Sequence, residues 1–139
     1  MKSHKLIHRD GECAQSLLET AFMLLVIFMV VFWIIEMCGM MYTYATIANA
    51  AEEGARYGIV SSGVVANDSR IVTRVKNFAG TSLHDVSRIS IEVSLPDGGS
   101  APPNKIKVTV SYTYVPWLNN IVKDALVMHA YAEGTMVVQ

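Results

Sequence analysis

The apolar positions of the chain form one long continuous run, followed by shorter periodic stretches. Residues 21–35 contain no polar side chain. As a helix, residues 20–35 cover roughly 24 Å at about 1.5 Å per residue, against a hydrocarbon core of about 30 Å. Glu19 or Glu36 must therefore lie at or inside the edge of the hydrocarbon. This pattern predicts a membrane-spanning helix with a carboxylate near one end.

The sequence after the run indicates that the helix continues out of the membrane. Residues 37–60 contain no proline and many alanines. Gly54 and Gly58 each weaken a helix by roughly 1 kcal/mol relative to alanine, so we expect it to end near Ser61–Gly63. Small residues at helical spacing would let a packing partner approach closely. They are Ala45, Ala48, Ala51, Ala55 and Gly58.

A second helix and three strands follow. Residues 64–80 are predicted to form a helix capped by Asn67 or Asp68 and stopped by Gly80, with one apolar stripe. Alternating apolar and polar residues predict strands over 89–95, 106–114 and 126–138. Each strand has one apolar face, as in a small antiparallel sheet packed on helices. The apolar stripe of the helix comprises Ile71, Val72, Val75, Phe78 and Ala79.

These elements predict an α+β fold class. A long N-terminal transmembrane helix extends into a small domain of one further helix and a three-stranded antiparallel sheet. At 139 residues the chain has room for one such domain. We expect a basic leader over residues 1–14, a transmembrane helix over 15–36, a helix extension over 37–62 and an extracytoplasmic head over 63–139.

Charge and motifs narrow the function classes. The net charge is −1 and Lys and Arg do not cluster beyond the first ten residues, so nucleic acid is not an expected partner. Neither a metal-ligand spacing nor a phosphate-binding glycine loop occurs, so no metal, cofactor or small-molecule substrate is expected. Ser82, His84 and Asp85 are neighbours in a predicted loop and lack triad geometry. No catalytic residue and no enzyme activity are predicted.

The basic residues predict the orientation of the anchor. Three of them precede the apolar run and the next is Arg56, so the N-terminus is expected in the cytoplasm. A secretory signal peptide would carry a small-residue cleavage site after the run, whereas helix-compatible sequence follows here. Cys13 precedes the run and Cys38 lies inside it, so we expect no structural disulfide. The three basic residues are Lys2, Lys5 and Arg9.

Two blocks lie on either side of the apolar run: residues 15–22 read QSLLETAF and residues 49–57 read NAAEEGARY. Together they resemble the TadE-like family of pilus-assembly proteins. Members of the family carry similar blocks in the same order and at the same separation, and the strands resemble the family's closing strands more loosely. The resemblance implies a component of the tight-adherence (Tad) pilus, whose proteins are similar to type IV pilins.

The resemblance also implies processing. Type IV pilins bear a short basic leader that a prepilin peptidase removes just before the apolar helix, and a glutamate follows as the fifth residue after the cut. On this sequence the cut falls between Ala14 and Gln15, and the glutamate is Glu19. Ala14 departs from the glycine that such peptidases usually meet. A cut after Gly11 would instead make Ser16 the fifth residue and lose the glutamate.

Glu19 has two interpretations. A carboxylate that enters the bilayer needs a positive partner, and the new α-amino group of a neighbouring processed subunit would provide one. Glu19 would then set the register of subunits during assembly. Alternatively, Glu19 lies at the headgroup boundary as the last polar residue before the membrane. Glu36 would fall near the opposite headgroups.

A second group of candidate residues lies further along the same helix. Glu52, Glu53, Arg56 and Tyr57 could form a docking surface. Alternatively, they could hold an ion pair that fixes the helix against the sheet, because Glu52 and Arg56 stand four residues apart.

The sequence therefore predicts a minor pilin or pseudopilin-like component in assembly of a Tad (type IVb-like) adhesive pilus. It would span the bacterial inner membrane once, with a periplasmic C-terminal domain, and the extracellular pilus is a further location. Expected partners are the lipid bilayer, other pilin and pilus-assembly subunits, and the prepilin peptidase. The alternative is an unprocessed single-pass membrane scaffold or binding subunit of a secretion apparatus.

Overall fold

The structure is a computed structural model that describes residues 7–61, 63–83, 85–98, 104–117 and 125–136. Side chains are described from Ala14 onward, except that of Asn104. The chain divides into two compact units, Met1–Cys38 and Gly39–Gln139. Helix α1, Ile7–Val60, contributes to both. Residues 1–6 of the predicted leader, His84, and most of the predicted loop between the first two strands lie outside the described residues.

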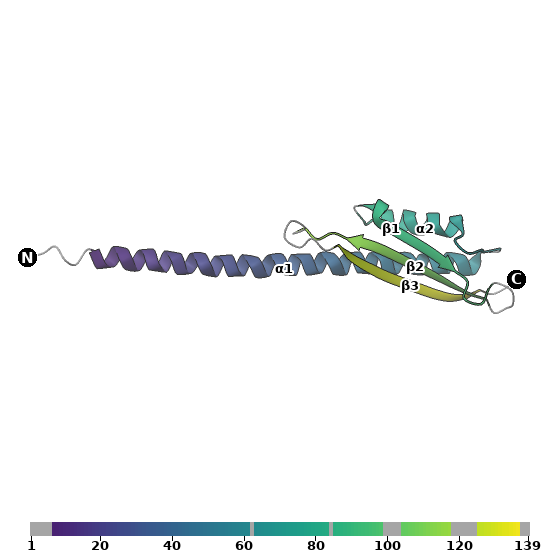
Figure 1. The fold of residues 1–139 in the computed structure, drawn as a ribbon, viewed down its shortest axis with the longest axis horizontal. Coiled ribbons are helices and arrows are strands. Elements are labelled where there is room, and N and C mark those ends of the chain that lie inside the picture. The colour runs from purple at the N-terminus through teal and green to yellow at the C-terminus, as the bar shows by residue number, and fades with distance from the viewer. Residues whose placement is uncertain (1–6, 62, 84, 99–103, 118–124, 137–139) are drawn as a thin grey trace, which may run out of the picture. The chain divides into compact units, whose positions relative to one another are not determined.

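The second unit contains the last part of α1, one further α-helix, a short 3₁₀ helix and one sheet (Figure 1). The sheet has the strand order β1-β2-β3, and both neighbouring pairs are antiparallel. The predicted α+β class is thus confirmed. The elements are α2, Ser69–Gly80; η1, Val86–Arg88; β1, Ile89–Ser94; β2, Asn104–Tyr114; and β3, Leu126–Met136.

One face of the sheet packs on α1 and α2. Val108 of β2 pairs with Val93 of β1 and with Ala132 of β3, so the apolar positions of the three strands share a face. These residues join buried side chains of both helices in a single core. Burial of apolar area at about 25 cal/mol per Å² is the main force that holds this core together. Its largest fully buried side chains are Ile47, Ile71, Val75, Val93, Ile106, Val108 and Val110.

Helix α2 starts at Ser69, so the predicted start at Val64 was wrong. Asp68 caps the helix, because its Oδ1 accepts a hydrogen bond from the Arg70 amide at 2.9 Å. Asn67 has a φ of 54°, in the left-handed region, and its backbone amide donates to the Val93 carbonyl at 2.9 Å. The residues before Ser69 therefore turn toward β1 instead of joining the helix.

The apolar stripe predicted for α2 is only partly buried. Ile71, Val75 and Ala79 are spaced four residues apart, which places them on one helix face, and all three are fully buried. Phe78, which was assigned to the same stripe, is 42% exposed. The face that meets the core is therefore narrower than the sequence pattern suggested.

The close approach predicted for the small residues of α1 is seen at three of the five positions. Ala51, Ala55 and Gly58 are buried, whereas Ala48 is half-buried and Ala45 is exposed. A Cβ built on Gly58 would lie 3.2 Å from Ile71 Cδ1 and would clash with Ile106 Cδ1. The absence of a side chain at this position lets α1 lie against both α2 and the sheet.

Candidate membrane and assembly surface

The first unit presents apolar side chains at almost every position of α1. The large apolar side chains from Leu17 to Ile35 have exposed fractions between 44% at Val31 and 73% at Leu17. A soluble monomer rarely exposes a contiguous apolar patch of more than a few hundred Å². This surface therefore needs a cover of lipid or of other apolar helices.

Within the described residues, one helical stretch is long and apolar enough to cross a membrane. It is Ala14–Val60, near the N-terminus. Buried helices of soluble proteins and signal sequences meet the same criterion of length and composition. Here none of the most apolar window is buried in the protein, which separates it from a core helix.

The predicted processing and register residues lie on this stretch of α1. Ala14, Gln15 and Glu19 are all within the helix and all exposed. Beside Glu19, the Thr20 hydroxyl donates to the Ser16 carbonyl at 2.9 Å, so that polar group is satisfied within the helix. No hydrogen bond or ion pair joins Glu19 to another described residue of this chain. Its carboxylate is thus open to a partner from outside.

Glu36, the carboxylate at the other end of the apolar run, is half-buried. It precedes Met37, where the exposed fraction of the apolar side chain falls to 38%. The two glutamates that bracket the run therefore differ in exposure, with Glu19 the more open.

The second candidate group makes a different contact from the one expected. Glu53 Oε1 accepts from Arg74 of α2, at 2.8 Å from Nη2 and 3.1 Å from Nε. Glu52 and Arg56 are exposed and do not form the ion pair that their spacing suggested. The ion pair of this group therefore joins α1 to α2, and not to the sheet. Exposed pairs of this kind contribute about 0–1 kcal/mol.

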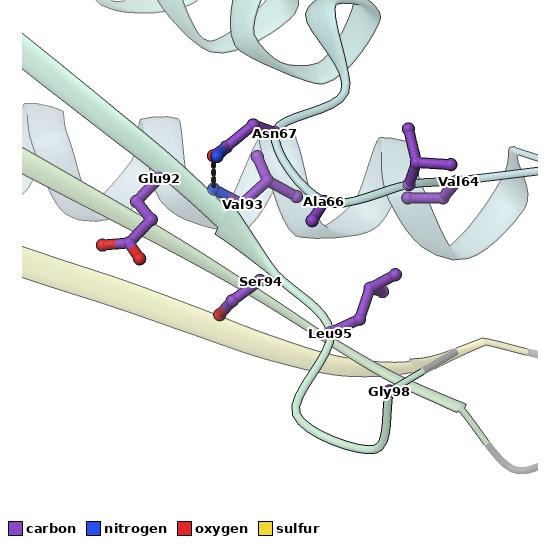
Figure 2. Close-up of a pocket in the computed structure, with 9 residues that line it drawn as sticks. Val64, Ala66, Asn67, Glu92, Val93, Ser94, Leu95 and Gly98 are labelled. Atoms are coloured by element: carbon purple, nitrogen blue, oxygen red, sulfur yellow. Dashed lines mark hydrogen bonds between the residues drawn. The ribbon is translucent and has the colours of Figure 1, made fainter. Parts of the chain in front are cut away.

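A shallow hollow lies beside the edge strand β1 (Figure 2). Asn67 forms one side, and its Oδ1 accepts a hydrogen bond from the Val93 amide at 3.1 Å. Together with the bond from the Asn67 amide to the Val93 carbonyl, this contact covers part of the strand's free edge. The hollow is lined by 64–67, 92–95 and Gly98, with Glu92 as its one carboxylate. These contacts protect the edge of β1, and no set of catalytic groups converges in the hollow.

The remaining polar contacts support the fold. The carboxylate of Asp68 accepts hydrogen bonds from the Arg70 side chain and from the Arg70 backbone amide. These bonds, the side-chain one first, lower the pKa of that carboxyl below its usual range. On the open face of the sheet, Lys107 Nζ lies 3.0 Å from Glu133 Oε1 and 4.4 Å from the centre of the Tyr131 ring. Among the described residues, no group of three His, Cys, Asp or Glu could hold a metal ion.

The exposed apolar helix and the α+β unit fit a single-pass membrane protein. A family model described as TadE-like protein matches residues 14–56, which confirms the resemblance inferred from the two sequence blocks. The match implies a role related to the Tad pilus, in a family whose members are generally structural and not enzymatic. It covers all of the candidate residues except Tyr57. No curated protein and no solved structure matches the chain.

Proposed function

We propose that this chain is a minor pilin or pseudopilin-like component in the assembly of a Tad (type IVb-like) adhesive pilus. The observation that carries the proposal is the TadE-like match on a helix whose apolar side chains are exposed from Leu17 to Ile35. Such a helix can serve both as a membrane anchor and as a packing element between subunits. The partners would be the bilayer, other pilin and pilus-assembly subunits, and a prepilin peptidase.

Packing between helices would drive assembly. Lipid tails are as apolar as these side chains, so exchange of lipid for another helix gains little hydrophobic free energy. Close van der Waals contact and the pairing of polar groups must then favour the assembled state. Glu19 is the polar group best placed for such pairing, since it is exposed at the start of the apolar run.

Processing between Ala14 and Gln15 would supply the partner for Glu19, because it creates a free α-amino group. Both residues lie inside α1, whereas adventitious proteolysis favours exposed loops. A cut at this bond would therefore point to a dedicated peptidase.

We expect intact-mass analysis of the membrane-extracted protein to find Gln15 at the mature N-terminus in a strain that has a prepilin peptidase. Ala14→Leu should leave the chain uncut, because a bulky side chain would occupy the position before the scissile bond. Ala21→Leu, the same substitution beyond that bond, is the matched control and should be processed normally. Retention of Met1 in a pilus-forming strain would favour the unprocessed scaffold instead.

We further propose that the N-terminus is cytoplasmic and that the unit Gly39–Gln139 lies in the periplasm of a bacterial inner membrane. The basic residues that precede the apolar run favour this orientation. A reporter that is active only in the periplasm, fused after Gln139, should therefore be active, and a cytoplasm-specific reporter at the same place should be silent. The reverse pair of results would invert the orientation and remove the periplasmic head from the proposal.

A further inference from the structure

Strand β2 ends beside the residue of α1 at which the second unit begins. A Cβ built on Gly54 would lie 3.2 Å from Val108 Cγ1, and one built on Gly39 would lie 3.0 Å from Tyr114 Oη. As residue numbers rise along β2, they therefore fall along α1, so the two elements run antiparallel. The C-terminal end of β2 is thus next to Gly39, which directly follows the first unit.

Exposed apolar side chains gather at this end of the second unit. Strand β3 begins there, because Leu126 pairs with Tyr114. Among the large apolar side chains here, the exposed fraction is 49% at Leu126 and 93% at Trp117, which follows Tyr114 by three residues. We define the apolar end by its exposed side chains, Met41, Tyr42, Tyr44, Trp117, Leu126 and Val127.

The described stretches that form the apolar end carry few charges. Residues 37–51 of α1 and residues 108–117 on and after β2 contain no Asp, Glu, Lys or Arg. On α1 the nearest charges on either side of this stretch are Glu36 and Glu52, and on β2 the charges are Lys105 and Lys107. Lys123 and Asp124, which precede β3 in the sequence, lie outside the described residues.

Along the sheet, the described charged residues nearest to the apolar end form an ion pair with each other. Arg88 Nε lies 2.9 Å from Asp85 Oδ2, just before β1, whose first residue pairs with Tyr112. An ion pair is compatible with the headgroup layer of a bilayer, where water and phosphate are at hand.

We propose that the apolar end rests in the interfacial layer of the membrane that α1 spans. Tryptophan and tyrosine concentrate at this depth because they combine an apolar ring with a polar group. Only residues 36–38 separate Gly39 from the apolar run, so a lipid surface is the partner nearest along the chain. The unit Gly39–Gln139 is then held to the bilayer at α1 and again at Trp117. This inference rests on α1 crossing the membrane and is independent of the pilus role.

Intrinsic fluorescence tests the depth of Trp117, because the chain has two tryptophans and Trp33→Phe leaves only Trp117. The full-length variant is reconstituted in phosphatidylcholine–phosphatidylglycerol vesicles with or without brominated acyl chains. We expect Trp117 to be quenched by the brominated lipid and to emit at shorter wavelength than a hydrated indole. Aqueous iodide should quench it several-fold less than it quenches the control.

The control places the single tryptophan at the far end of the unit. Val60 ends α1 and is 84% exposed, so Trp33→Phe/Trp117→Phe/Val60→Trp should be open to iodide and unaffected by brominated lipid. If Trp117 is as open to iodide as this control, the proposal is wrong. Protection from iodide without quenching by brominated lipid would also overturn it, since a second copy of the chain would then be the cover.

Discussion

Gly54→Leu is expected to unfold the α+β unit or to destabilise it by about 3 kcal/mol or more, at the upper end of what overpacking costs. A Cβ on Gly54 would lie 2.5 Å from Val75 Cγ2, 3.2 Å from Val108 Cγ1 and 3.6 Å from Ile71 Cγ2. These atoms come from α2 and β2, so the new side chain would separate α1 from both. Val75 and Val108 are β-branched and fully buried, and therefore have little freedom to rotate away.

The measurement is urea unfolding of the full-length protein in detergent micelles, followed by near-ultraviolet circular dichroism. Glu52→Leu adds the same side chain at an exposed position of the same helix, and should change the free energy of unfolding by no more than about 0.5 kcal/mol. Equal midpoints for Gly54→Leu and the parent would mean that α1 does not pack this closely on α2 and the sheet.

The strands could be predicted from the sequence because their periodicity and their burial have one cause. A sheet with one covered face requires alternation, and Ile89, Val93 and Val110 all lie on the buried face that the alternation indicates. The long helix could be predicted equally well, since residues 21–35 contain only apolar side chains and no proline breaks the sequence up to Val60.

The start of α2 depends on contacts that no local pattern reveals. Residues 64–68 suit either a first helical turn or a loop. The choice is made by Val93, which exchanges two hydrogen bonds with Asn67 across 26 positions of sequence. Asn67 had been considered only as a helix cap, although asparagine is one of the few residues that readily adopts a positive φ.

Contacts between residues that are distant in the sequence also explain why the second candidate group forms a different ion pair from the expected one. A spacing of four residues suggested that Glu52 pairs with Arg56. Folding instead brings Arg74 to Glu53 across 21 positions, because α2 packs beside the last turns of α1. Gly54 was likewise interpreted only as a residue that weakens a helix, whereas its contacts show that it provides room for a packed neighbour.

The register mechanism predicts a more selective failure at Glu19. Glu19→Ala should insert normally and be processed, because removing a charge from the apolar end eases insertion by up to about 3 kcal/mol. Piliation should nevertheless be lost. The α-amino group of the neighbouring subunit would remain in a region of low dielectric without its counter-charge, and deleting one member of a buried pair typically costs about 3–5 kcal/mol. The measurement is surface piliation and co-purification with other pilus proteins at matched membrane levels.

Two further variants separate charge from size and from position. Glu19→Gln keeps the shape of the side chain but cannot neutralise an ammonium group, so it should fail as Glu19→Ala does. Glu36→Ala should be mild, because near the opposite headgroups water can solvate the site with or without the carboxylate. If Glu19→Ala forms pili like the parent at equal protein level, Glu19 is a boundary residue and does not set subunit register. If both glutamate positions fail equally, the defect lies in the anchor as a whole and the specific pairing is excluded.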